Sequence, residues 1–195
     1  MAGVPFDEMR SRYATALPQV AAALGGRATA PLANDPGVAA LVDSPIPLVV
    51  AAQGPLAMRR AARLGLGAIY NSLQTQERTR ALSDLYADEG GTAPRILIRR
   101  VWLGPPPLDA MNAQMARFRA VGPAELQAHW DPDGGLVSAL DGTELAERLH
   151  DAMVGGRCDA INLRIFQAGL SPADVRNQIA LLGEKTLPHL RALLN

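Results

Sequence analysis

The residues with the clearest chemical potential are Gln53-Gly54-Pro55, which follow an apolar segment. Gly54 has no side chain, so a ligand could approach the backbone closely there. Pro55 at the first helical turn would leave the next amides, those of Leu56 and Ala57, aimed outward. Unpaired amides at a helix start favour an anion such as a phosphate. The alternative is a short loop with good helix-start chemistry and no ligand. The segment lacks a GxGxxG fingerprint, so it does not predict a dinucleotide-binding fold.

Polar side chains also lie in or at the ends of three other apolar segments. They are Asn71, Ser72, Arg99, Arg100, Asn162 and Arg164. Ligands bind at the carboxyl ends of parallel strands, both in α/β barrels and in open sheets. Alternatively, Arg99 and Arg164 snorkel or form buried ion pairs with a helix.

Other catalytic patterns are missing from the sequence. The three histidines have no metal-ligand spacing, and the single cysteine, Cys158, excludes a disulfide framework and reads as a small buried residue. We therefore expect no metal site, and the sequence assigns no acid, base or nucleophile. An active enzyme of this kind would take its chemistry from a cofactor.

The elements that position these residues alternate between strand and helix. Short apolar segments at 45–52, 67–71, 95–103 and 159–166 read as buried strands, and helical patterns follow each of them. Four such units predict a parallel α/β sheet, as an open doubly wound sheet or as half of a (β/α)8 barrel. The region 104–142 reads as a polar, helical insertion. Its Met111, Met115 and Phe118 stripe predicts packing against the core or, alternatively, a lid.

Size and charge narrow the class of protein further. The chain has 195 residues, which fits a single domain spanning 1–195. Nineteen basic side chains balance nineteen acidic ones, so the formal net charge is zero. A neutral chain offers no field that would attract nucleic acid or an acidic membrane. The sequence shows no signal peptide or membrane-spanning segment, and we expect a cytoplasmic protein that acts on a small molecule.

Segments along most of the chain resemble a known family. The sequence Pro45-Ile-Pro-Leu-Val-Val-Ala-Ala-Gln-Gly-Pro, followed by Ala-Ala-Arg-Leu-Gly-Leu-Gly-Ala-Ile, is similar to the fifth strand, helix and sixth strand of bacterial luciferase-like flavin- or deazaflavin (F420)-dependent oxidoreductases. The opening, from Gly3 to Tyr13, resembles the segment after that family's fourth strand. The close, at 159–166 and 171–188, resembles its eighth strand and last helix.

The resemblance implies the C-terminal half of a (β/α)8 barrel, without its first four strands. It also implies FMN or F420 as cofactor and a monooxygenase-like oxidoreductase activity. By motif match, five residues would approach the cofactor and Asn71 would face the substrate or cofactor. The five are Ala52, Gln53, Gly54, Leu56 and Ala57. The family's Gly-Asp-Gly is Gly65-Leu66-Gly67 here, so its acidic residue is lost.

Two other interpretations of a half-barrel remain open. One is a non-catalytic relic that binds little. The other is one half of a split or oligomeric enzyme. A half-barrel exposes the edges of its first and last strands, and exposed edges need cover. We therefore expect a homo-oligomer or pairing with a complementary half-barrel.

Overall fold

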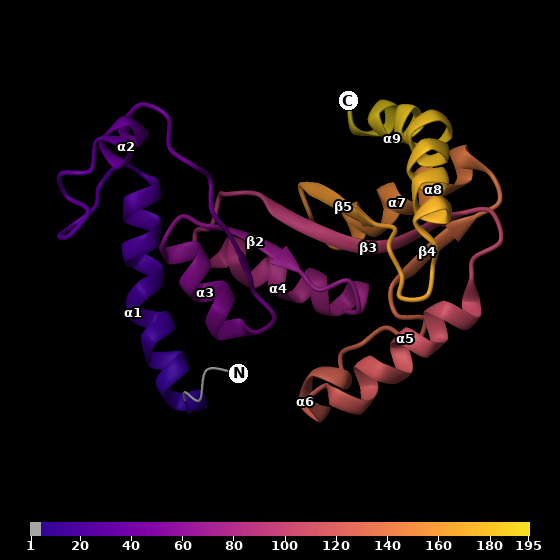
Figure 1. Ribbon diagram of the computed structural model, residues 1–195, viewed down its shortest axis with the longest axis horizontal. Helices are drawn as coiled ribbons and strands as arrows, with labels where there is room; N and C mark the ends of the chain where they lie inside the picture. Colours follow the sequence, from indigo (N-terminus) through magenta and orange to yellow (C-terminus); the bar gives the residue numbers. More distant parts are fainter. Residues whose placement is uncertain (1–4) are drawn as a thin grey trace.

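The computed structural model describes residues 5–195 (Figure 1). Gly3 and Val4, which open the family resemblance, lie outside the described residues. Three helical segments precede the sheet, namely α1 (Phe6–Leu24), α2 (Pro36–Ala39) and the short 3-10 helix η1 (Ala40–Val42). The five strands are β1 (Val49–Ala51), β2 (Gly67–Tyr70), β3 (Arg95–Leu103), β4 (Leu136–Ala139) and β5 (Ala160–Arg164). The remaining helices are α3 (Pro55–Arg63), α4 (Gln76–Asp88), α5 (Leu108–Val121), α6 (Ala124–Gln127), α7 (Gly142–Gly155), α8 (Pro172–Lys185) and α9 (Leu187–Leu194).

All pairings between the named strands are parallel, which confirms the predicted α/β class with barrel-type βα units. The strands β1, β2, β3 and β5 lie side by side in that order. The long strand β3 coincides with the predicted strand at 95–103. Its first residues pair with β2, and its last four pair with β4 on the same side. This four-strand path with covering helices is the arrangement expected of half a (β/α)8 barrel.

The strand β4 is an addition to the four expected strands. It lies in the region 104–142, which the sequence predicts as helical and which does contain α5 and α6. Four residues between Gly135 and a turn are too few to show a strand period. Its pairing with Arg100–Leu103 of β3 is what makes this segment a strand.

Three of the predicted strands are shorter in the structure, and the second covers Gly67–Tyr70 of 67–71. The first covers only Val49–Ala51 of 45–52, because Pro45 and Pro47 have no amide hydrogen to donate to a sheet. The fourth covers Ala160–Arg164 of 159–166.

The apolar core lies between one face of the sheet and helices α3, α4, α7, α8 and α9. Alternate residues of the strands enter it, such as Ala52, Tyr70 and Leu97, each with 0% exposure. The opposite residues, among them Ala51, Ala160 and Asn162, lie on the inner face of the sheet and are exposed. Helix α5 covers the carboxyl-terminal part of this inner face, where the Arg164 guanidinium lies 5.9 Å from the centroid of the Phe118 ring.

Candidate functional site

The turn between β1 and α3 has the open geometry that the sequence predicts. Gly54 precedes the helix in an extended conformation, with φ −149° and ψ 166°, and a Cβ atom there would meet nothing within 4 Å. No side chain caps the start of α3, and Pro55 occupies its first turn. The amides of Leu56 and Ala57 therefore lie at a helix start that no side chain caps, next to the open space at Gly54, as an anion site requires.

Gln53 and Asn71 meet at the carboxyl ends of β1 and β2. The Asn71 side-chain amide donates to Gln53 Oε1 across 3.5 Å, while Asn71 Oδ1 accepts from the amide of Leu73 at 2.9 Å. Both side chains are half-buried. This pair places two neutral hydrogen-bonding groups beside the start of α3.

The other predicted residues lie differently. The Ala52 side chain is fully buried in the core, so only its backbone could reach a ligand. The side chain of Leu56 is 57% exposed and lines a shallow hollow with Tyr13 and Arg60. The structure therefore brings Gln53, Gly54, Ala57 and Asn71 together at one edge of the sheet. Their roles toward a cofactor remain predictions.

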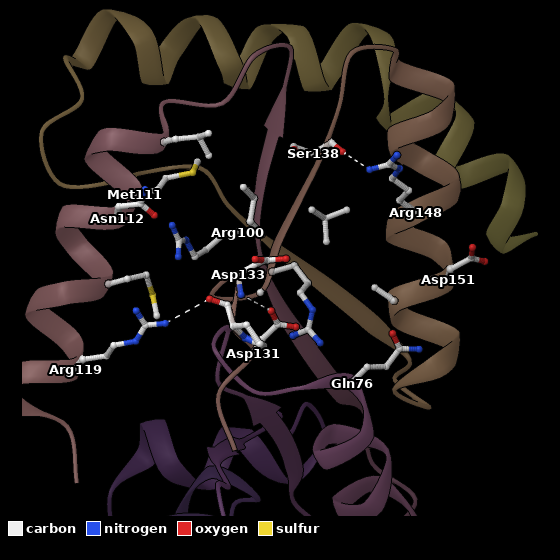
Figure 2. A pocket seen from close by; sticks show the side chains of 18 residues that line it. Gln76, Arg100, Met111, Asn112, Arg119, Asp131, Asp133, Ser138, Arg148 and Asp151 are labelled. Atoms are coloured by element: carbon white, nitrogen blue, oxygen red, sulfur yellow. Dashed lines mark hydrogen bonds between the residues drawn. The ribbon is translucent and has the colours of Figure 1, made fainter. Parts of the chain in front are cut away.

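A cavity of about 580 Å³ lies beside this edge, around strand β4 (Figure 2). Residues of α5 line one side of it and residues of α7 the other, with the loop 131–135 between them. The loop packs directly behind Asn71, because a Cβ atom on Gly135 would collide with the carbonyl oxygen of Ser72. Gly134 and Gly135 both have positive φ, 65° and 64°, a conformation that glycine adopts without strain. None of the six predicted cofactor residues lines this cavity.

The neighbouring residues Arg99 and Arg100 both reach the cavity from β3. They are 4% and 1% exposed. Arg99 Nη1 donates to the carbonyl oxygen of Ile98 at 3.0 Å, and Arg100 Nη1 donates to that of Gly134 at 3.3 Å. Burial lowers the pKa of both guanidinium groups, and the charge of Arg164 lowers the pKa of Arg100 further. Within residues 5–195 neither forms an ion pair, so the expected alternative of a buried ion pair is wrong for Arg99.

The methionine stripe of α5 forms an apolar wall of the same cavity. Met111 and Met115 are 2% and 4% exposed, which agrees with the packing role that the sequence predicts for them. The sequence did not point to Arg119, Asp131 or Asp133, which also line the cavity. The run Asp131-Pro-Asp-Gly-Gly135 was the available signal, because its residue types are those of a tight turn.

The chain matches known proteins among solved structures. No family model matches it, and neither does any curated protein. Among solved structures, it is similar to monooxygenase RslO1 from Streptomyces bottropensis, with 17% sequence identity and a TM-score of 0.52. The match covers 73% of this chain and 48% of that protein, so this chain spans about half the length of its structural neighbour. At this identity the likeness shows a shared fold.

Two features are absent from the part of the chain that the structure describes. No helix there is long and apolar enough to cross a membrane. That part of the chain also contains no group of three or more His, Cys, Asp or Glu side chains that could hold a metal ion.

Proposed function

We propose that this chain is half of a flavin- or F420-dependent oxidoreductase of the luciferase-like family. The observation that carries the proposal is the open start of α3 at the carboxyl edge of a parallel sheet. The family resemblance of the segments at 45–55 and 61–69 points to the same turn. A further support is the shared fold with a protein named as a monooxygenase.

The residues at this turn fit the phosphate-bearing tail of such a cofactor. The amides of Leu56 and Ala57 would donate to the phosphate, and the open space at Gly54 would admit it. Gln53 and Asn71 would hydrogen-bond the polar chain of the cofactor, and the backbone of Ala52 would lie against it. FMN or F420, when bound, supplies hydride-transfer chemistry, and the protein would orient the cofactor and keep water away.

A second candidate is a half-barrel whose site is completed by another chain, and the exposed inner face favours it. In the described part of the chain, the outer edges of β1 and β5 pair with no strand. We propose that a second copy or a complementary half-barrel supplies the closing strands. A non-catalytic relic would share this architecture and bind neither cofactor.

Binding of each cofactor to the whole chain tests the proposal. We expect FMN or F420 to bind at concentrations below about 1 mM, where binding is worth roughly 4 kcal/mol. Gly54→Asp should abolish this binding, because a carboxylate at the helix start would bond the free amides and repel a phosphate. Gly54→Ala is the matched control, since its Cβ enters empty space and adds no charge. Failure of both cofactors to bind would reject the proposal in favour of the relic.

A further inference from the structure

We propose that the cavity around β4 is a binding site for a small acid with an apolar body, in which Arg100 receives its carboxylate or phosphate group. This site is separate from the cofactor turn at α3. Because no cofactor is involved, the inference does not depend on the proposed oxidoreductase activity.

Among the described residues, the two buried arginines of this protein lack the ion pairs that several of its exposed arginines form. Several exposed arginines have carboxylate partners, as Arg63 has in Glu89 at 2.9 Å and Arg148 in Glu144 at 2.6 Å. On β3 itself, Arg95 forms a two-pronged pair with Asp159. The two most buried guanidinium groups, at positions 99 and 100, have only single bonds to backbone carbonyls, and of the two it is Arg99 on which a carboxylate, that of Asp131, acts. Buried charges are normally paired, so a partner from outside the chain is the simplest compensation.

Arg100 has hydrogen-bonding capacity left over. Its Nε atom is buried and has no partner among the described residues. Its register neighbour on β5 is Arg164, on the same face of the sheet, and two like charges there would both be stabilised by one anion. Figure 2 shows Arg100 between β3 and α5, on the side where Arg119 also points inward. A guanidinium fork with free donors matches a carboxylate or phosphate.

Glycine at position 134 lets the loop 131–135 pack closely against Arg100, whose Nη1 donates to the carbonyl oxygen of Gly134. A side chain on Gly134 would collide with Arg100 Nη1 and would come within 2.7 Å of Met115 Sδ. Any residue other than glycine at position 134 would therefore disrupt the close contact between the loop and Arg100. Arg100 is thus held at the wall of the cavity, with 1% of its surface exposed.

The other walls define what kind of molecule fits. A volume of about 580 Å³ is that of a small organic ligand and exceeds what a bare phosphate needs. Leu108, Met111 and Met115 give one side an apolar surface for the body of the ligand. Asp131 and Asp133 also face the cavity, and Asp131 Oδ1 accepts from the Asp133 amide at 2.9 Å. These carboxylates disfavour a ligand with several negative groups, so the site suits a single acidic group.

Thermal unfolding of the whole chain tests this site with three probes of the same shape. Phenyl phosphate and benzoate carry the two kinds of acidic group, and phenol is the neutral analogue. We expect one or both acids to raise the melting temperature by about 3 °C over sodium chloride of equal ionic strength. Phenol should not. Comparing the two acids distinguishes a phosphate site from a carboxylate site.

Two variants test whether the rise in melting temperature depends on Arg100. Arg100→Gln should lose the shift, whereas Arg63→Gln, which removes an exposed charge on α3, should keep it. An equal shift with phenol, no shift with either acid, or a shift retained in Arg100→Gln would overturn the inference. Should Arg100→Gln fail to fold, backbone amide resonances of the unaltered protein decide. Phenyl phosphate or benzoate should then move those of 99–100 and 133–135, and movement confined to other residues would overturn it.

Discussion

The Asp159 carboxylate clamps the start of β3 by accepting three hydrogen bonds from Arg95. The backbone amide donates at 2.8 Å, and the guanidinium donates through Nε and Nη2 at 2.9 Å each. The clamp lies at the amino-terminal end of the sheet, opposite the candidate sites. It joins β3 to the beginning of β5 before their ladder starts at Ile96 and Ala160.

Removal of this clamp should destabilise the sheet without touching either proposed site. We expect Asp159→Asn to lower the free energy of unfolding by about 1 kcal/mol, a small value because the Asp159 side chain is 46% exposed. Urea unfolding at pH 7 measures it. Glu8→Gln, which breaks an exposed pair with Arg12 within one helix, is the control and should cost less than half as much.

The same carboxylate predicts a dependence of stability on pH. Its bonds with Arg95 lower the pKa of Asp159 below its ordinary value of 3.8. A lowered folded-state pKa contributes stability that is present above the unfolded pKa and is lost as the pH falls through the folded one. The unaltered protein should therefore lose more stability than Asp159→Asn between pH 5 and about pH 2. Parallel acid limbs for the two proteins would contradict this.

A buried chain of hydrogen bonds joins β2, α4 and the end of α7. The hydroxyls of Tyr70 and Ser83 lie 2.8 Å apart, and Ser83 donates to the carbonyl oxygen of Gly156 at 2.8 Å. Both side chains are fully buried. Ser83→Ala should therefore cost about 1–3 kcal/mol, because it leaves the Tyr70 hydroxyl without its partner.

The double variant with Tyr70→Phe identifies the origin of that cost. If the unpaired hydroxyl causes it, adding Tyr70→Phe to Ser83→Ala should cost little more than the single change. Urea unfolding of the four proteins in the cycle provides the coupling free energy. Strictly additive losses would show that the two hydroxyls do not act together.

Cys158 should be nearly inert in the folded protein. Its side chain is 7% exposed, and burial raises the pKa of the thiol from 9.0 to about 11. That change alone reduces the reactive thiolate about a hundredfold, since two pKa units are involved. We expect Ellman's reagent to react far more slowly with the native chain than with the chain in guanidinium chloride, where one thiol should react promptly. Similar rates in both would show that the thiol is accessible.

Local patterns made much of the fold predictable. The nine-residue run of β3 is apolar enough to identify it, and Ser171-Pro172 marks the start of α8 by chemistry confined to one turn. There the Ser171 hydroxyl accepts from the Asp174 amide at 3.1 Å, and the Asp174 carboxylate accepts from the Ser171 amide at 3.2 Å. Such signals depend only on residues close in sequence.

The cavity was not predictable, because it depends on contacts between distant segments. Alternation along β3 places Arg99 and Arg100 on opposite faces, which argues against a shared site. They both line one cavity because it extends around the short strand β4, which the sequence did not reveal. Nor could the sequence show that Arg99 has no carboxylate partner, since that depends on which acids the fold brings near.

The inner face of the sheet predicts self-association. Four parallel strands in the order β1, β2, β3 and β5 have free outer edges at both ends, among the residues described. A second copy related by a twofold axis along the strands would pair β5 of each copy with β1 of the other and would give eight parallel strands. The exposed inner side chains of Ala51, Ala160 and Asn162 would then become buried. Light scattering should give a mass at least twice 20.6 kDa.

Charged substitutions test whether the inner face makes this contact. Ala160→Asp places a charge on the inner face of β5 and should shift the protein toward monomer, because its carboxylate would be buried against the partner. Ala173→Asp adds the same charge to an exposed position in the first turn of α8, where a carboxylate is favourable, and should leave the mass unchanged. Far-ultraviolet circular dichroism would check that both variants keep the helical content of the unaltered chain. A monomeric unaltered protein at tens of micromolar would exclude the second copy as the closing half, whereas an oligomer insensitive to Ala160→Asp would place the contact on another surface.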